Sequence, residues 1–482
     1  MATPTYVMPL PLKVETWQEH ILEKRLNIGR NIYNACLGEA WRRYKYMIRN
    51  PRYWEVVRMP KGKERNQLLD QWKEQYGFRK FDLNMYVQEM GRKFKQNIGS
   101  QMAQNIAERA FRAVEKVLYG NGKKVRFCSV GQFFSLEEKT NKTGFRYFPE
   151  TKRIEWLGLI LPVILKDHDE YAHIALQDKM KYCRLVKKVI RGKNRYYVQF
   201  ALEGFPPKKH NQNYSKDESA RVGLDIGTST LAIASEKEVK LLELAEGLST
   251  REHKKRILQR KLDRRRRANN PNKYKEDGTI NKSNREKWMQ SENYKKARKE
   301  VAEMSRKVAD KRRLAHNILA NHILSLGLDI RVETMNFKGL QAKTKKTEGS
   351  EKTGRFKRKK RFGKSLANRA PSMLLTIIDN KLNYFGLSLK RIDTAKVKAS
   401  QFEHFTQTYV KKKLWERWNH FEQCNVQRDL YSAFLIMNTK DNLREIDVGR
   451  ANKTWDHFFE KHEQEMERIK HLNKKQLRSI GL

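Results

Sequence analysis

The spacing of apolar residues predicts helices in the first quarter of the chain. After a short apolar strand at 5–12, the pattern from Val14 to Trp41 becomes helical. Residues 101–119 then place apolar side chains at the i, i+3, i+4 and i+7 positions of an amphipathic helix. We therefore expect residues 15–120 to be a helical domain inserted after a first strand.

Strand patterns replace the helical ones in the region that follows. Alternating and continuous apolar runs, separated by turn residues, are typical of β structure. Arg191 and Gly192 begin a hairpin connection between two of these runs. The expected strands cover 124–130, 152–165, 183–190 and 195–202.

The second half of the chain begins after a polar segment. Residues 206–220 are led by two prolines and show no periodicity, so we expect a linker. From Arg221 the sequence RVGLDIGTSTLAIAS predicts two buried strands around a glycine turn. Residues 251–314 read as two long basic helices around a polar excursion at 269–285, and 341–364 form a basic block that we expect to order on nucleic acid.

Charge restricts the possible partners. The 482 residues include 103 Lys plus Arg against 55 Asp plus Glu, a net charge of +48, while 38% are hydrophobic. That apolar share is enough for folded cores and argues against a disordered polycation. The excess charge predicts a nucleic-acid partner, with an anionic membrane surface as the weaker alternative.

No membrane span, export signal or disulfide framework is expected. The longest apolar stretch, Trp156–Leu165, is interrupted by Pro162 and is far shorter than the ~20 residues that cross a bilayer, so we interpret it as a core strand. The N-terminus lacks the pattern of a signal peptide, which predicts a cytoplasmic protein. The four cysteines are widely spaced and form no CxxC pair.

Three acids lie inside apolar segments rather than in charged ones. They are Asp225 in VGLDIG, Glu333 in RVETMNF and Asp429 at the start of DLYSAFLIMN. A buried carboxylate is costly unless it is paired or bound to a metal. Two acids at strand ends and one in the first turn of a helix could converge on Mg²⁺ ions that hydrolyse a phosphodiester. Alternatively, each is a separate structural acid, and only their proximity in space decides.

The motifs around these acids resemble a known family. GLDIG at 223–227, VETMNFKGL at 332–340 and RDLYSA at 428–433 are similar to the three motifs of RuvC-type, RNA-guided DNA nucleases. That family comprises the transposon-encoded TnpB proteins and their descendants, the compact type V CRISPR effectors. Basic helices between the first two motifs and a β module with a helical insertion before them also fit, so the resemblance covers nearly the whole chain.

The resemblance implies a multidomain α+β architecture. A β-barrel-like wedge domain with a helical recognition insertion would precede an RNase H-like (RuvC) α/β nuclease domain with basic helices and a zinc-ribbon-like hairpin that lacks its cysteines. The expected parts are 1–14 and 121–205 for the wedge, 15–120 for recognition, 206–220 for the linker, 221–395 for the nuclease domain with basic helices 251–328 and basic loop 341–364, 396–427 for the degenerate ribbon, and 428–482 for the third motif and tail.

The resemblance also implies a reaction. Asp225, Glu333 and Asp429 would be the catalytic residues and would bind two Mg²⁺ or Mn²⁺ ions. The protein would hold a guide RNA, recognise double-stranded DNA beside a short flanking motif and hydrolyse it at this single site. The guide could come from a transposon end or a CRISPR array, in mobility or antiviral defence, and the protein could be a monomer or a homodimer. Its place would be the prokaryotic cytoplasm, at the nucleoid when bound to DNA.

Two positions depart from the family pattern. The cysteine pairs of the zinc ribbon are missing, so we expect no zinc; His404, His420 and Cys424 are the weak candidates for a substitute site. We expect a hairpin at 409–421 to be held instead by the aromatic residues Phe402, Trp415, Trp418 and Phe421, with stacking of these rings on bases as the alternative. In the third motif Tyr431 replaces an asparagine, which leaves the three acids intact but could weaken metal positioning.

Nucleic-acid contacts are expected on two helices. The candidates are Arg264, Arg265, Arg266 and Arg267 in the first basic helix, and Gln104, Asn105, Arg109 and Arg112 on the polar face of 101–119. For the second set a simple solvated face is the alternative interpretation.

Three other functions stay open from the sequence. A nuclease-inactive, RNA-guided DNA-binding repressor would need the loss of an acid, and none is lost. The DIGT pattern at 225–228 also occurs in actin-like ATPases and sugar kinases, and a second D-x-G stands at Asp447-Val448-Gly449. An enzyme of that class, however, would not need the net charge of +48. A binder of nucleic acid without enzymatic activity leaves the three acids unexplained.

Overall fold

The chain folds into two compact units, Met1–Lys209 and His210–Leu482. The computed structural model describes residues 3–208, 213–342, 362–413, 416–422, 424–472 and Leu477. Each unit combines helices with its own β-sheets, so the protein is a mixed α/β protein with more than one domain. The division between the units falls within 206–220. Most of the basic block 341–364 and Trp415 lie outside the described residues.

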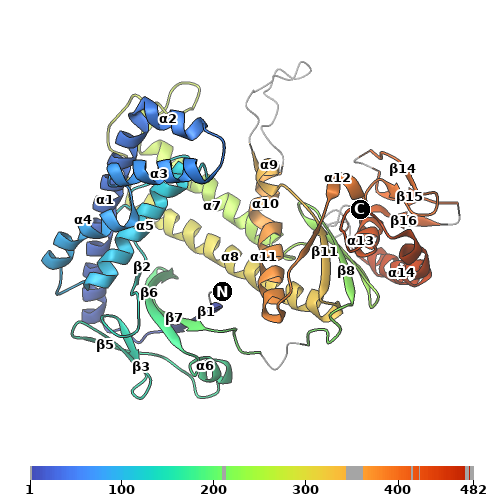
Figure 1. Cartoon of the computed structure of the whole chain (residues 1–482), viewed down its shortest axis with the longest axis horizontal. Coiled ribbons are helices and arrows are strands. Elements are labelled where there is room, and N and C mark those ends of the chain that lie inside the picture. The colour runs from blue at the N-terminus through green and yellow to red at the C-terminus, as the bar shows by residue number, and fades with distance from the viewer. Residues whose placement is uncertain are drawn as a thin grey trace. The chain divides into compact units, whose positions relative to one another are not determined.

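Helices fill the first part of the first unit (Figure 1). They are α1 (Thr16–Arg49), α2 (Pro51–Arg58), α3 (Lys63–Gln75), α4 (Lys80–Lys93) and α5 (Ser100–Leu118). The break between α1 and α2 follows from Pro51, which cannot continue a helix but suits the first position of the next. Asn50 caps α2 by accepting from the backbone N–H of Arg52. The helix predicted over 101–119 is confirmed as α5.

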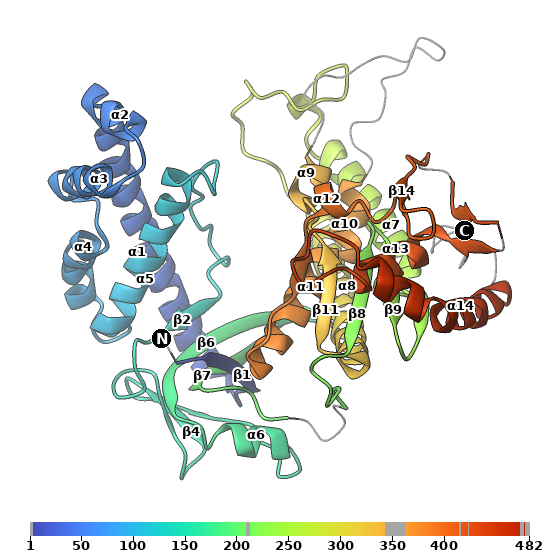
Figure 2. The same ribbon diagram turned by 45° about the vertical axis from the view of Figure 1, so that its right-hand side comes forward.

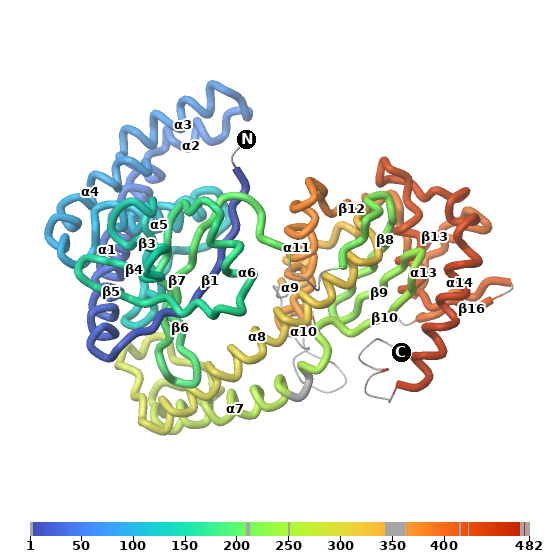
Figure 3. The backbone as a smooth tube through the Cα atoms, turned by 90° about the horizontal axis from the view of Figure 1, so that it is seen from below, coloured from blue at the N-terminus to red at the C-terminus, as the bar shows by residue number. Residues whose placement is uncertain are grey.

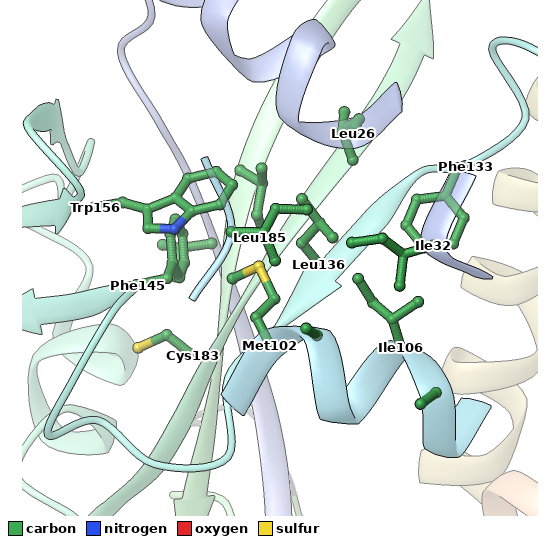
Figure 4. Close-up of a cluster of buried hydrophobic side chains, with 14 of the residues drawn as sticks. Leu26, Ile32, Met102, Ile106, Phe133, Leu136, Phe145, Trp156, Cys183 and Leu185 are labelled. Atoms are coloured by element: carbon green, nitrogen blue, oxygen red, sulfur yellow. The ribbon is translucent and has the colours of Figure 1, made fainter. Parts of the chain in front are cut away.

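Two antiparallel sheets complete the first unit. One has the order β1-β7-β6-β2 and the other β3-β4-β5. Their bounds are β1 (Thr5–Pro11), β2 (Ser135–Glu137), β3 (Arg146–Phe148), β4 (Arg153–Trp156), β5 (Leu159–Pro162), β6 (Met180–Ile190) and β7 (Lys193–Glu203), with α6 (Glu170–Ala175) between β5 and β6. Buried side chains from α1, α5 and the strands form one core, which Figure 4 shows around Ile106, Leu136 and Trp156.

Two of the expected strands of this unit are wrong. Residues 124–130 form no strand, because Asn34 of α1 binds both the backbone N–H of Cys128, at 2.8 Å, and its carbonyl, at 2.9 Å. The run 152–165 is not one strand but the hairpin β4–β5, which turns at Leu157 and Gly158 with φ of 46° and 77°. The β6–β7 hairpin is confirmed, with a turn at Arg191 and Gly192.

A five-stranded mixed sheet organises the second unit. Its order is β10-β9-β8-β11-β12, in which β8, β9 and β10 pair antiparallel while β11 pairs parallel with β8 and β12. The bounds are β8 (Arg221–Ile226), β9 (Thr230–Ser235), β10 (Val239–Glu243), β11 (Asp329–Glu333) and β12 (Lys390–Ile392). The two strands predicted after Arg221 are therefore confirmed as β8 and β9.

Helices cover both faces of this sheet (Figures 2 and 3). Leu231 and Ile233 of β9 pack in the core formed with α8 (Glu292–Leu326) and α11 (Pro371–Leu382), whereas Ala232 and Ala234 pack toward α13 (Arg428–Met437). This alternation follows the two-residue period of a strand. Gly223 allows α13 to approach β8 closely, since a Cβ there would lie 2.0 Å from the carbonyl oxygen of Ala433.

The remaining elements of the second unit flank this sheet. The predicted basic helices correspond to α7 (Ser249–Ala268) and α8, joined through the short helix η1 (Pro271–Lys273). Others are α9 (Phe337–Gln341), α10 (Gly363–Arg369), η2 (Asn383–Phe385), α12 (Thr394–Val397) and α14 (Val448–Lys470). The expected single hairpin at 409–421 is wrong: β13 (Phe402–Glu403) pairs with β14 (Thr408–Tyr409), and β15 (Trp418–His420) pairs with β16 (Asn425–Gln427).

Candidate active site

The sheet register brings two of the predicted acids side by side. In the parallel pair β8–β11, Arg331 lies opposite Gly223 and Val332 opposite Leu224, so Glu333 follows next to Asp225 where both strands end. Asp225 shares a strand face with Gly223, the position where α13 comes closest. The first turn of α13 carries Asp429.

All three acids line one cavity of about 580 Å³. Asp225, Glu333 and Asp429 are each half-buried in its wall. The other lining residues are the turn Ile226–Thr230, Met335, Ser400, Gln401, Lys411, Lys412, Arg417 and Arg428. Three acids that are far apart in the sequence thus share one space, which separate structural roles would not require.

The negative charges of these acids act on one another. Burial, together with the charges of Asp429 and Glu333, raises the pKa of Asp225 well above its ordinary value, against the opposing charge of Arg428. Burial also raises the pKa of Glu333. A cation placed among the three carboxylates would relieve this cost.

Two arginines that the sequence reasoning missed hold Asp429. Arg428 donates from Nη2 and Nε to Asp429 Oδ1 at 3.0 and 3.2 Å, and Arg417 Nη1 lies 3.7 Å from Oδ2. Arg428 also donates to the carbonyl of Glu416 at 2.8 Å, which ties residues 396–427, here called the insert, to the start of α13. The basic sequence KKK at 411–413 was the available signal for cations at this cavity.

The carboxylates suit Mg²⁺ in chemistry but are not gathered into a ready-made cage. Oxygen donors are the ligands that Mg²⁺ and Mn²⁺ prefer. Within the described residues, however, no group of three or more His, Cys, Asp or Glu side chains converges closely enough to hold a metal ion. A metal bound there would compete with Arg417 and Arg428 for the oxygens of Asp429.

Tyr431 points away from the cavity into an aromatic cluster. Its hydroxyl accepts from the backbone N–H of His404 at 3.1 Å and lies 2.7 Å from His404 Nδ1. Burial lowers the pKa of His404 to about 4, so its neutral ring can accept from the hydroxyl at pH 7. The neighbouring rings are Phe405, Phe421, Phe434 and Trp455. Tyr431 thus connects α13 to the insert instead of reaching the acids.

The weak zinc candidates have other contacts. His404 is fully buried against Tyr431, and His420 Nδ1 lies 2.6 Å from the side chain of Asn425. Cys424 is half-buried beside the aromatic cluster. Of the aromatics expected to hold the insert, Phe402 is buried, Phe421 packs in the cluster, and Trp418 is 37% exposed.

The four consecutive arginines of α7 do not form one free basic surface. Arg265 donates to the carbonyl of Asn293 at 2.6 Å, while Arg266 and Arg267 both bind Asp263. Arg267 also donates to the carbonyl of Gly278. Arg264 is exposed.

The predicted binding face of α5 needs a correction as well. Asn105 is buried and donates to the carbonyl of Glu137 at 3.0 Å, so it does not lie on a solvent face. Arg109 donates to the carbonyl of Ser135 and lies over the ring of Phe133. Gln104 accepts from Lys139, and Arg112 is exposed. The apolar pattern could not show that β2 packs beside this helix.

The kinase interpretation gains no second phosphate loop. Asp447 caps the start of α14 by accepting from the backbone N–H of Arg450, and Val448 and Gly449 are the first residues of that helix. The second pattern therefore lies at a helix start and not in a strand–turn–strand unit like that of β8 and β9.

Comparison with known proteins gives structural neighbours only. No protein-family model and no curated protein matches the chain. A cryo-EM structure of the Cas12f1–sgRNA–target DNA complex is similar with a TM-score of 0.40 and 9% identity, over 89% of this chain and 98% of the other. A CRISPR–Cas12f ternary complex gives a TM-score of 0.28 and 13% identity, over 89% and 83%.

Both neighbours are Cas12f complexes. At these TM-scores the likeness carries no conclusion about activity, which has to come from the cavity itself. Among the described helices, none has the length and apolar character needed to span a lipid bilayer.

Proposed function

We propose that the chain is an RNA-guided DNA endonuclease whose single active site consists of Asp225, Glu333 and Asp429 in an RNase H-like (RuvC) domain. The observation that carries this proposal is the common cavity that the three acids line. The mixed sheet with helices on both faces supports the RNase H-like interpretation.

The three carboxylates would hold Mg²⁺ or Mn²⁺. When bound, such ions activate water for attack on a phosphodiester and stabilise the charge that develops on its oxygens. Arg428 orients Asp429 through two hydrogen bonds to a single oxygen, Oδ1. Within the part of the chain that the structure describes, the second oxygen, Oδ2, has only the longer contact with Arg417.

The cations of the insert give the cavity a way to bind its substrate. Lys411, Lys412 and Arg417 line the same space as the acids, and a DNA strand brings phosphates on both sides of the cleaved bond. Asn419 accepts from Lys412 Nζ and fixes that ammonium within the insert. We infer that these cations position the strand while the acids act on it.

A guide RNA is the partner that we propose for the net charge of +48. The wedge and recognition domains would hold the RNA, whose pairing with one DNA strand selects the target. The first experiment is therefore to express the chain with its native flanking DNA, purify it in high salt and sequence the bound RNA. One abundant structured RNA with a variable end supports guidance; heterogeneous cellular RNA, or none, contradicts it.

Cleavage is tested separately with the identified guide. Mg²⁺-dependent cutting of double-stranded DNA that is lost in Asp225→Ala, with guided binding retained, supports the active site. Binding without cutting by the unaltered protein would instead identify the nuclease-inactive repressor. Cutting by Asp225→Ala at a normal rate would show that the assigned site is wrong.

A further inference from the structure

The connection between α7 and α8 is a folded surface element outside the proposed active site. We call residues 269–291 the tip segment; it is the yellow-green loop region between these helices in Figure 2. It contains η1 and an isolated antiparallel bridge between Tyr274 and Ile280. The polar excursion expected from the sequence is thus an ordered structure rather than a plain loop.

Two buried polar side chains fix the shape of the tip segment. Asn270 donates to the carbonyls of Arg266 and Met289 at 2.9 and 3.0 Å and accepts from the backbone N–H of Met289 at 2.7 Å. Lys273 donates from Nζ to the carbonyls of Asn284, at 3.2 Å, and Glu286. Because a buried amide or ammonium is costly unless bonded, these contacts hold the segment in one arrangement.

This arrangement presents an aromatic ring at the surface. Trp288 is 38% exposed, and its ring is supported by the guanidinium of Arg266 at 5.5 Å and Nζ of Lys273 at 5.4 Å from the ring centroid. Tyr274 contacts it edge-on at 6.1 Å. The adjacent Met289 is 69% exposed. An exposed flat ring that is already held in place loses little conformational entropy when a ligand stacks on it.

Basic residues without ion-pair partners among the described residues lie close to Trp288 in the sequence. Lys275, Lys282, Arg285 and Lys287 are all exposed, and among the described residues none of them forms an ion pair with a carboxylate. On α7 and α8 some basic side chains are paired, as Arg306 is with Glu303 and Asp310, and others, such as Arg264, are exposed. Free cations beside an exposed aromatic ring match the two chemical parts of a nucleotide, its phosphate and its base.

We propose that the tip segment binds an unpaired nucleotide of single-stranded RNA, which stacks on Trp288 while its phosphates contact the neighbouring lysines and Arg285. Bases inside a duplex do not offer a free face, so the nucleotide has to be unpaired or at a helix end. RNA is chosen over DNA because it is the resident strand in the proposed function, on which this inference rests. The charge disfavours a protein partner that would require an apolar surface alone.

The test compares variants of the full chain in binding to a labelled single-stranded RNA, by fluorescence anisotropy at two salt concentrations. Trp288→Ala should weaken binding about tenfold, on the scale of one lost base–aromatic stack, and Trp288→Phe should restore most of it. The double variant K282Q/K287Q should lower the salt dependence of binding. Tyr384→Ala, which removes a 40% exposed aromatic ring from η2 of the same unit, is the matched control and should bind normally.

Several results would overturn the inference. They are unchanged RNA binding by Trp288→Ala, an equal loss in Tyr384→Ala, or a loss that Trp288→Phe does not restore and that accompanies a lower melting temperature. A loss seen only with single-stranded DNA of the same sequence would overturn the choice of RNA, and loss of a protein partner with RNA binding intact would overturn the class of ligand. A chain that binds no nucleic acid at all would contradict the proposed function itself.

Discussion

The charged side chains at the two ends of β8 and β11 differ in whether they form ion pairs. Where the strands begin, the fully buried Arg331 donates to Asp329 and to Asp441, each at 2.8 Å, and Arg221 pairs with Asp441 at 2.9 Å. Where the strands end, Asp225 and Glu333 form no ion pair with any described residue. One end is a neutralised network, whereas at the other end two carboxylates have no ion-pair partner among the described residues.

The pKa values follow this difference. Burial acts to raise the pKa of Asp329, but hydrogen bonds and the charges of Arg331 and Lys390 outweigh it and lower the pKa. Burial and two like charges raise the pKa of Asp225. Since the fold neutralises carboxylates at one end of these strands, the charge left at the other end is better explained by a ligand than by folding.

The largest expected effect is on cleavage. Asp225→Asn should reduce guided cleavage by a factor on the order of 10³ or more, because in the proposed function it removes a carboxylate that would touch the reacting groups. In the absence of metal, the free energy of unfolding should stay the same or rise slightly, because one of three repelling charges is gone. Single-turnover assays measure the cleavage rate, and urea unfolding measures the stability. Glu236→Gln, at an exposed acid of the same unit, serves as the control and should cleave normally.

A substitution at the other end of these strands, where the charges are paired, should change stability rather than cleavage. Arg331→Met should lower the free energy of unfolding by about 1–3 kcal/mol, because the half-buried Asp329 loses its hydrogen-bonded partner and keeps only Lys390 at 3.1 Å and the longer contact with Arg221 among the described residues. Adding Asp329→Asn should recover part of this loss, which a double-mutant cycle in urea would measure. A change below about 1 kcal/mol in Arg331→Met would break the contrast between the two ends.

The pH dependence should have opposite signs at the two ends. In metal-free protein the folded state holds the proton of Asp225 more tightly than the unfolded state, so stability should fall as pH rises from about 4 to the raised pKa. The slope from this group is at most about 1.4 kcal/mol per pH unit. Asp225→Asn should remove it. Asp329 contributes in the reverse sense, with stability lost as pH falls below its ordinary pKa.

The uncharged pair Tyr431 and His404 should give the smallest effect on stability. Tyr431→Phe removes the hydroxyl that binds His404 and should cost about 1–2 kcal/mol, seen in chemical unfolding and in faster proteolysis of the insert. Tyr409→Phe, at a half-exposed tyrosine of the same insert, should be neutral. If Tyr431→Phe left folding intact but abolished cleavage, Tyr431 would belong to the active site after all.

Local sequence was sufficient for several elements. The i, i+3, i+4 spacing predicted α5, and the turn at Arg191 and Gly192 predicted the β6–β7 hairpin. It failed at 124–130, where a side chain of α1 takes the backbone hydrogen bonds that a strand would need. It also failed for Asn105, whose burial depends on β2, a partner that no local pattern reveals.

By itself, the sequence determined the order of the elements and identified Asp225, Glu333 and Asp429 as acids without a local reason to be buried, because periodicity and motif order are properties of neighbouring residues. Only the tertiary structure decided that the three acids share a cavity, that Arg417 and Arg428 hold Asp429, and that Tyr431 turns to His404. Those facts depend on the parallel register of β8 and β11 and on the close approach of α13 over Gly223, which long-range packing sets.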